Sequence, residues 1–422
     1  MSESAEQASE HIAELLKYTN TTRRAALDAA ISRRALLRGV AVGGAAIAGA
    51  RLLAACGVAP ANKTVPESEA VGHAAATDYS TTEKLVNFSN WPAYIDVSDS
   101  NANDHPTLDE FTKQTGIKVN YVEEINDNND FYTKIDPMLA AGKDTDRDVI
   151  VLSDFMIPKL RELNYIQELD ARNVPNRANM LPAMLNDPVD PGRKFSMPWA
   201  SGYTTIAYNA KLVPTPITSI KELFTRPDLK GRVSLLAEME DTVAFALFAI
   251  GKSPASFTDT DFANALAYIR KAKDAGQIRQ FSGNDYLSDF QQGNTAATMA
   301  YSGDVAQLDQ PELKTVQLPT EGLLSWSDNM VIPNYARHKA NAEKLMNFYY
   351  QPDIAAQLSD YVDYIPPVTG AVPALQKLDG DAAGNPLIVP TAQMTAKAKP
   401  FKTLTIKQLD SYTQQFQQIT GQ

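Results

Sequence analysis

From residue 84 onward, short apolar segments typical of strands alternate with amphipathic segments typical of helices, and this alternation strongly limits the possible folds. The clearest strand is Asp148-Val149-Ile150-Val151-Leu152, whose unbroken apolar run is typical of a parallel strand buried on both faces. The helix predicted over 107–115 is followed by Gly116, a residue that suits a helix C-terminus. A series of strands and helices in alternation predicts an α/β fold with mostly parallel sheets flanked by helices.

Three extended segments look able to pass from one sheet to another, which points to two lobes. The longest, 195–209, contains Pro198, and a strand with an internal proline can leave one sheet and enter the next. Two further crossings are predicted at 323–332 and 364–367. A chain of 422 residues has room for two lobes of ordinary domain size. We expect residues 81–200 plus 327–366 to form lobe one and 201–326 plus 367–422 to form lobe two.

The other predicted elements follow from periodicity and from turn residues. Strands are expected near 85–88 and at 117–122, 233–236 and 296–301, and helices at 130–141, 157–163, 242–250, 259–275, 285–292, 338–350 and 352–362.

Residues 1–55 have the features of an export signal and are not expected to belong to the fold. Ser32-Arg33-Arg34 begins a twin-arginine pattern, and an apolar run over 39–50 follows that is too short to span a bilayer. Leu53-Ala54-Ala55-Cys56-Gly57 then resembles a lipobox, so we expect cleavage before Cys56 and lipidation of its sulfur. Residues 56–80 are expected to be a flexible tether to that membrane anchor. The alternative is a short amphipathic helix with an ordinary buried thiol.

Composition and motifs exclude several classes of function. The net charge of −11 disfavours nucleic acid as a partner and suits a cationic ligand. The four histidines are scattered without metal-ligand spacing, and a single cysteine rules out an internal disulfide. The chain lacks a Gly-x-Ser-x-Gly motif and a phosphate-binding loop, so we expect neither an enzyme nor a cofactor. A glycosidase built on Asp304 and Asp328 is the remaining enzymatic alternative.

Aromatic residues stand at the predicted strand ends and crossings, where ligands bind in open α/β sheets. Trp91 and Tyr94 follow the first strand, and Pro92 fixes the backbone between them. Asp304 and Asp328 each follow an aromatic residue, by three and two positions. Aromatic faces suit electron-poor methylenes beside a cation, and carboxylates neutralise buried ammonium groups. The pattern therefore favours a ligand with a cationic, methylene-rich body.

Several motifs, taken together and in order, resemble the spermidine/putrescine class of periplasmic substrate-binding proteins. They are Asn90-Trp91-Pro92-Ala93-Tyr94-Ile95, 111–119, 148–153, Phe195-Ser196-Met197-Pro198-Trp199, Ser302-Gly303-Asp304, Glu321-Gly322 with Trp326-Ser327-Asp328, and 347–353. The resemblance covers about 84–378. It implies a periplasmic-binding-protein fold in which two lobes close on the ligand like a clamshell. It also implies an ABC permease as partner, and a monomer.

The resemblance also implies roles for individual residues. The implied ligand-binding residues are Trp91, Tyr94, Ser153, Tyr301, Asp304, Trp326, Asp328 and Tyr364, with Glu240 or Asp241 ahead of Glu238 as the acid after the strand at 233–236. The sequence departs from the family in two places, since related proteins often have Trp at the position of Tyr301 and some have Tyr near Phe155.

Simpler interpretations stand beside these roles. Asp304 could cap a helix, Asp328 could form an Asx-turn with Asn329, and the acids at 238–241 could be an ordinary helix N-terminal charge pattern. A tryptophan such as Trp199 is more often core than ligand wall.

The leading hypothesis is a lipid-anchored receptor outside the cytoplasm that captures putrescine or spermidine for an ABC importer. The first alternative is the same fold with another small solute, such as an amino acid derivative, another organic cation or a metal chelate. The second is a ligand sensor that signals to a membrane partner.

Overall fold

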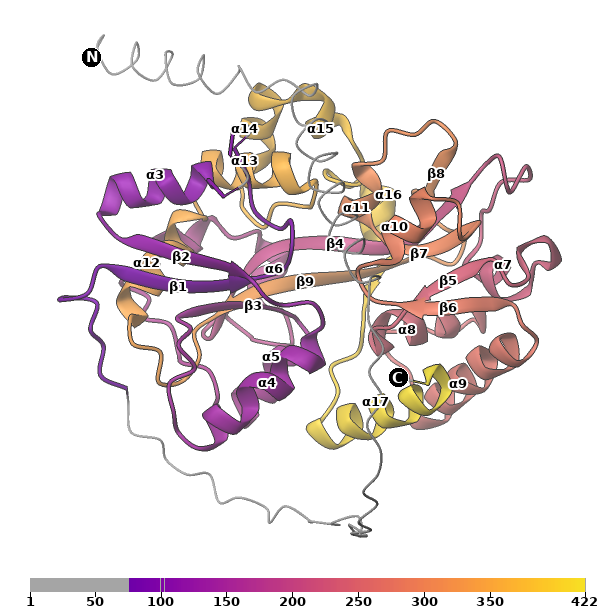
Figure 1. Cartoon of the computed structure of the whole chain (residues 1–422), viewed down its shortest axis with the longest axis horizontal. Coiled ribbons are helices and arrows are strands. Elements are labelled where there is room, and N and C mark those ends of the chain that lie inside the picture. The colour runs from indigo at the N-terminus through magenta and orange to yellow at the C-terminus, as the bar shows by residue number, and fades with distance from the viewer. Residues whose placement is uncertain (1–75, 99, 102, 422) are drawn as a thin grey trace, which may run out of the picture. The chain divides into compact units, whose positions relative to one another are not determined.

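The computed structural model describes residues 76–98, 100–101 and 103–421 (Figure 1). The predicted export signal, Cys56 and most of the predicted tether lie outside the described residues. The segment Val97–His105 belongs to a separate small unit. In this segment Ser98 pairs with Asn101, and the Ser98 N–H donates to the Asp104 carbonyl at 2.9 Å.

The rest of the described chain is built on ten strands in one mixed sheet. The strands are β1 (Leu85–Asn90), β2 (Lys118–Glu123), β3 (Val149–Ser153), β4 (Ser196–Asn209), β5 (Val233–Leu236), β6 (Ile278–Ser282), β7 (Ala297–Tyr301), β8 (Leu313–Val316), β9 (Leu323–Val331) and β10 (Ala398–Pro400). Their order is β2-β1-β3-β9-β4-β7-β5-β6, with β10 beside β9 and β8 beside β4. The pairs β1–β2, β1–β3, β5–β6 and β5–β7 are parallel, whereas β9 and β4 run antiparallel to their neighbours on the main path.

Strands β4 and β9 join the two parallel halves of the sheet, as Figure 1 shows. One end of β9 pairs with β3, and β4 pairs with β7 from Thr204 to Tyr208. These two strands occupy the segments predicted as the first two crossings. At the third predicted crossing, Ile365 makes an antiparallel bridge with Ser201 of β4.

Helices fill the connections between strands. They are α3 (Pro106–Thr115), α4 (Asn128–Ala140), α5 (Met156–Glu162), η1 (Pro175–Asn179), α6 (Pro182–Leu185), α7 (Ile220–Thr225), η2 (Pro227–Leu229), α8 (Met239–Ala249), α9 (Asp259–Asp274), α10 (Tyr286–Gln291), α11 (Ser302–Ala306), α12 (Lys339–Phe348), α13 (Pro352–Val362), α14 (Ala371–Leu378), α15 (Gly380–Gly384), α16 (Ala392–Lys397) and α17 (Ile406–Thr420).

Strand β3 shows why the first half of the sheet is covered on both faces. Successive side chains of a strand point to opposite faces. Val149 and Val151 lie in one hydrophobic cluster, together with Phe88, while Ile150 and Leu152 lie in another. Both faces are thus buried, as the unbroken apolar run predicts.

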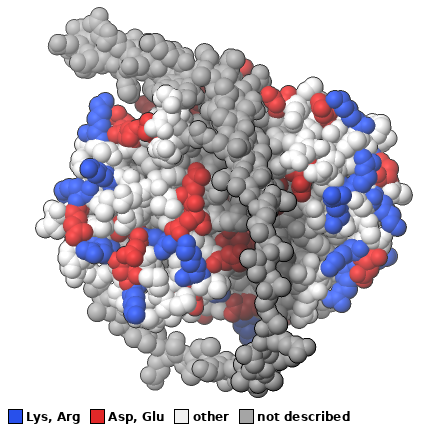
Figure 2. All heavy atoms as spheres, in the orientation of Figure 1, with Lys and Arg blue, Asp and Glu red and all other residues white. Residues whose placement is uncertain are grey.

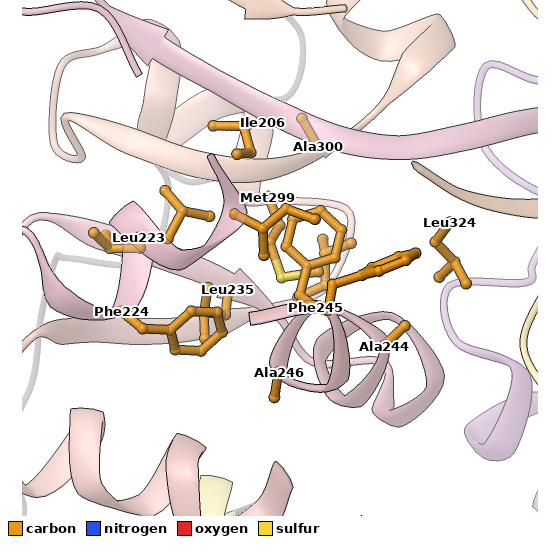
Figure 3. Close-up of a cluster of buried hydrophobic side chains, with 14 of the residues drawn as sticks. Ile206, Leu223, Phe224, Leu235, Ala244, Phe245, Ala246, Met299, Ala300 and Leu324 are labelled. Carbon is orange, nitrogen blue, oxygen red and sulfur yellow. The ribbon is translucent and has the colours of Figure 1, made fainter. Parts of the chain in front are cut away.

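The second half of the sheet has a core of its own, centred on helix α8. Phe245 is fully buried there and belongs to the same cluster as Leu235 of β5 and Met299 of β7 (Figure 3). All but one residue of α8 are buried. This matters for function because the first turn of so apolar a helix carries Glu240 and Asp241.

The fold is therefore the expected α/β arrangement with crossing strands between two sheet halves. The residue boundaries of the two lobes remain a prediction.

Candidate ligand-binding site

Asp328 lies where strands β3 and β9 meet. The register of the two strands places it opposite Ser153, whose hydroxyl donates to Asp328 Oδ1 at 2.7 Å. The Tyr94 hydroxyl donates to the other oxygen, Oδ2, at 2.8 Å. The carboxylate is thus oriented from two sides. Asp328 and Asn329 are both extended residues of β9, and they pair with Ser153 and Leu152 of β3. The alternative that Asp328 forms an Asx-turn with Asn329 is therefore wrong.

Four predicted aromatic residues form a row beside this carboxylate. The ring of Tyr94 meets that of Tyr364 edge-on, with centroids 5.4 Å apart. Trp326 follows at 5.4 Å from Tyr364, and Tyr301 at 5.6 Å from Trp326. These residues come from the loop after β1, the third crossing segment, β9 and β7. The tertiary structure therefore brings together rings that are far apart in the sequence.

The other two tryptophans have different surroundings. Trp91 is half-buried and packs against both clusters that flank β3, and its indole N–H donates to the Val151 carbonyl at 3.0 Å. Trp199 is fully buried against Phe88 and Tyr349. Trp199 is therefore core, as its alternative interpretation holds.

Asp304 lies in the first turn of α11 and is held by two tyrosines. The Tyr364 hydroxyl donates to Asp304 Oδ1 at 3.0 Å and the Tyr286 hydroxyl donates to Oδ2 at 2.7 Å. Tyr286 was not predicted from the sequence, where it looked like one more residue of a helix. Its hydroxyl also accepts the Tyr301 backbone N–H at 3.0 Å, so it connects the aromatic row to Asp304.

The acids around the start of α8 extend the site. The Thr204 hydroxyl donates to Asp241 Oδ1 and accepts the Trp326 indole N–H at 3.1 Å. The Asn128 amide donates to Glu238 Oε1 at 3.2 Å and to Ser153 Oγ at 3.0 Å. Neither carboxylate oxygen of Glu240 has a hydrogen-bond partner among the described residues.

Burial makes this group of acids hard to ionise. Desolvation raises the pKa of Asp328 to about 6 and that of Asp241 to about 7, with the nearby charge of Asp328 adding to the shift at Asp241. Desolvation also raises the pKa of Glu240 to about 8 and holds that of Glu238 well above its usual value. The acid Asp154, which was not predicted as a site residue, has its pKa raised by desolvation to about 7.

A cationic ligand would relieve this unfavourable state, because an opposite charge favours the ionised carboxylate. Acidic side chains also gather beside the middle of the face seen in Figure 2, while lysines and arginines lie mainly toward its two sides. In the described part of the chain, no group of three or more His, Cys, Asp and Glu side chains is arranged to hold a metal ion. The buried acids and the row of aromatic rings together suit an organic cation with a methylene body.

The comparison with protein families agrees with the fold. The model for the bacterial extracellular solute-binding proteins matches residues 107–386, which is more than half of the chain. The chain belongs to this family. The members of this family are solute-binding proteins of transporters. Among the described residues of this chain, no helix is long and apolar enough to cross a membrane.

Individual relatives are similar over most of their length. The chain is 30% identical over 333 residues to a spermidine/putrescine-binding periplasmic protein of Salmonella typhimurium, covering 78% of this chain and 89% of the relative. It is 28% identical over 378 residues to a putrescine-binding periplasmic protein of Pseudomonas aeruginosa, covering 85% and 97%. The solved structure of a putative spermidine/putrescine ABC transporter from Listeria monocytogenes matches with a TM-score of 0.69 at 26% identity, over 80% of this chain and 99% of that one.

Proposed function

We propose that this protein is a receptor outside the cytoplasm that captures a polyamine, putrescine or spermidine, and delivers it to an ABC import permease. The observation that carries the proposal is the geometry at Asp328. The residue is 8% exposed, and its carboxylate is oriented by Ser153 and Tyr94 and stands beside a row of aromatic rings. The curated relatives are named for the same ligands.

The roles of the predicted residues follow from their chemistry. Asp328 and Asp241 would neutralise an ammonium group, since each is buried and has its orientation set by a hydroxyl donor. Tyr94, Tyr364, Trp326 and Tyr301 would pack against the methylenes next to the charge. Ser153 would act mainly by orienting the carboxylate of Asp328, and Asp304 by holding the hydroxyl of Tyr364. Trp91, which is hydrogen-bonded to β3, would add one more aromatic ring to the wall of the site.

Capture would work by closure of the two lobes, 81–200 plus 327–366 and 201–326 plus 367–422. Tyr94 and Asp328 come from the first, and Trp326, Tyr301 and Asp241 come from the second. A ligand that touches both lobes has more contacts in the closed form and favours that form by its differential affinity. We further propose that lipidated Cys56 anchors this monomer to the membrane and that 56–80 is its tether.

The proposal is tested by calorimetric titration of the purified protein with putrescine, spermidine and butylamine. We expect one equivalent of each polyamine to bind and the monoamine to bind far more weakly. Asp328→Asn should weaken binding of both polyamines by at least about tenfold, because a buried ammonium loses its charge partner. Asp353→Asn, a change at an exposed acid of α13, is the control and should leave affinity unchanged.

Absence of heat with either polyamine, on protein that unfolds cooperatively, would overturn the proposal and direct the search to other solutes. Affinity for butylamine equal to that for putrescine would also contradict it.

A further inference from the structure

Asn128, the first residue of helix α4, uses every hydrogen-bonding group of its side-chain amide except one lone pair. The residue is 1% exposed. Its Oδ1 accepts the Ser153 backbone N–H at 3.0 Å, and its Nδ2 donates to Ser153 Oγ at 3.0 Å and to Glu238 Oε1 at 3.2 Å. Because a backbone N–H can only donate, the amide oxygen must face it, and the two amide hydrogens are left for the two acceptors. The orientation of this amide is therefore fixed.

The hydrogen bond from Asn128 to Glu238 joins the two halves of the sheet. Helix α4 follows β2 of the first half, whereas Glu238 stands between β5 of the second half and helix α8. Phe155, which follows β3, packs against the α8 cluster as well as against one of the clusters that flank β3. The two halves therefore touch at this point, and Asn128 makes a polar contact across the junction.

The same amide is linked to the carboxylate of Asp328. A hydroxyl has a single hydrogen, and that of Ser153 goes to Asp328 Oδ1 at 2.7 Å, so Ser153 Oγ must accept from Asn128. Hydrogen bonds in such a chain polarise one another and strengthen together. Asn128 thus acts on Asp328 through Ser153 while it also holds Glu238 of the other half.

An ordinary role in starting helix α4 does not account for this amide. The N-cap of α4 is Asp127, whose side chain accepts the backbone N–H groups of Asn129 and Asp130. The Asn128 side chain turns instead to the end of β3 and to the segment after β5. Replacing Asn128 should therefore leave the helix cap in place.

We propose that Asn128 is a positioning residue whose hydrogen bond to Glu238 acts as a latch on the closed form of the protein and slows release of the ligand. When the lobes separate, this hydrogen bond must break, because its two partners lie in different halves of the sheet. A cation in the site favours the ionised form of a nearby carboxylate, which is the stronger acceptor. The latch is therefore strongest when the ligand is bound. This inference rests on the proposed polyamine function and on closure of its two lobes.

The test is a double-mutant cycle between Asn128→Ala and Glu238→Ala. Stopped-flow fluorescence gives the association and dissociation rates of the polyamine that the wild type binds more tightly. We expect Asn128→Ala to speed dissociation about tenfold, as for loss of a hydrogen bond to a charged group, and to change association less than about threefold. In the Glu238→Ala background the same change should speed dissociation less than about threefold. Any direct contact of Glu238 with the ligand is lost in both variants that carry Glu238→Ala, so it cancels in the cycle.

Asn173→Ala is the matched control. Asn173 also donates its side-chain amide to a carboxylate, that of Glu343 at 2.7 Å, but both residues belong to predicted lobe one. Its loss should leave the dissociation rate within about threefold of the wild type, because this pair stays intact when the lobes separate.

An unchanged dissociation rate in Asn128→Ala would overturn the latch, as would an equal acceleration with and without Glu238. If Asn128→Ala does not fold, judged by thermal unfolding, Asn128→Asp takes its place in the cycle. An aspartate keeps an acceptor for the Ser153 N–H but has no hydrogen to donate to Glu238 when ionised. A wild-type protein that binds no polyamine refutes the receptor and the latch together, whereas wild-type binding without coupling in the cycle refutes only the latch.

Discussion

Two glycines determine how closely the aromatic rings of the site can lie against the backbone. A Cβ atom on Gly303 would stand 2.4 Å from Cε2 of Tyr364, and one on Gly202 would stand 2.5 Å from Cζ2 of Trp326. Side-chain Cβ atoms essentially never approach this closely. Each glycine therefore provides the space in which a ring of the aromatic row lies.

We expect Gly303→Ala to push the Tyr364 ring out of place and to weaken polyamine binding about fivefold or more, in line with overpacking costs of about 1–3 kcal/mol. In a Tyr364→Ala background the same change should cost little, because the ring that it displaces is gone. A double-mutant cycle by calorimetric titration measures this coupling.

Gly384→Ala is the control for the glycine substitution, since no heavy atom lies within 4 Å of a Cβ at that position. Additive losses in the cycle would show that Gly303 acts on the fold and not on the ring.

At the level of elements, helix α17 links two parts of the molecule. Its residues Leu409, Tyr412 and Phe416 pack in the α8 cluster, where Tyr412 stacks on Phe262 at 3.6 Å between centroids. On another side, Asp410 accepts from the Lys159 ammonium of α5 at 3.1 Å. That ammonium also lies 4.2 Å from the ring centroid of Tyr132. The ion pair thus connects helices that pack in different hydrophobic clusters.

If the lobes separate when the ligand leaves, this pair must break, and its loss should favour the open form. We expect Lys159→Met and Asp410→Asn each to speed dissociation of the polyamine about two- to fivefold, as a partly exposed ion pair contributes about 0.2–1 kcal/mol. Stopped-flow measurement of the dissociation rate, with Trp fluorescence as signal, checks this.

Lys113→Met is the matched control, because Lys113 pairs with Glu110 within the single helix α3. Dissociation rates that are the same in all three variants and the wild type would contradict a role for the pair in closure.

At the level of the whole molecule, the buried acids make folding depend on pH. Burial raises the pKa of Asp328 to about 6, those of Asp154 and Asp241 to about 7, and that of Glu240 to about 8, all well above their values in an unfolded chain. Between the unfolded and folded values the native state holds more protons than the unfolded state. The free energy of unfolding therefore falls as pH rises through this window.

We expect the ligand-free protein to lose stability between about pH 4 and pH 8, starting from ordinary carboxyl pKa values near 4. A polyamine supplies the missing positive charge, so it should raise the unfolding temperature more at pH 8 than at pH 5. Thermal unfolding with and without spermidine at the two pH values measures the effect. An equal shift at both values would mean that ligand binding is not coupled to these carboxylates.

Much of the fold was predictable because its signals are local. The strand at Val233–Leu236 and the helix at Pro352–Val362 have the predicted bounds, the first marked by an apolar run and the second by proline in the first turn. Strand β6, Ile-Arg-Gln-Phe-Ser, was not predicted, because three of its five residues are polar and it lies at the end of the sheet. Helix α17 was also not predicted, although its apolar residues recur at helical spacing.

The sequence by itself determined the types of group in the site: aromatic rings at strand ends, carboxylates close behind them and a glycine before Asp304. Only the tertiary structure decided which carboxylate oxygens have partners, because those partners come from distant segments. Tyr94 reaches Asp328 across 234 positions, through a strand order that places β1, β3 and β9 together. The same packing buried Glu240 without a hydrogen-bond donor from the described part of the chain. Sequence patterns report what a segment buries, whereas hydrogen bonding of a buried group depends on what the rest of the fold brings to it.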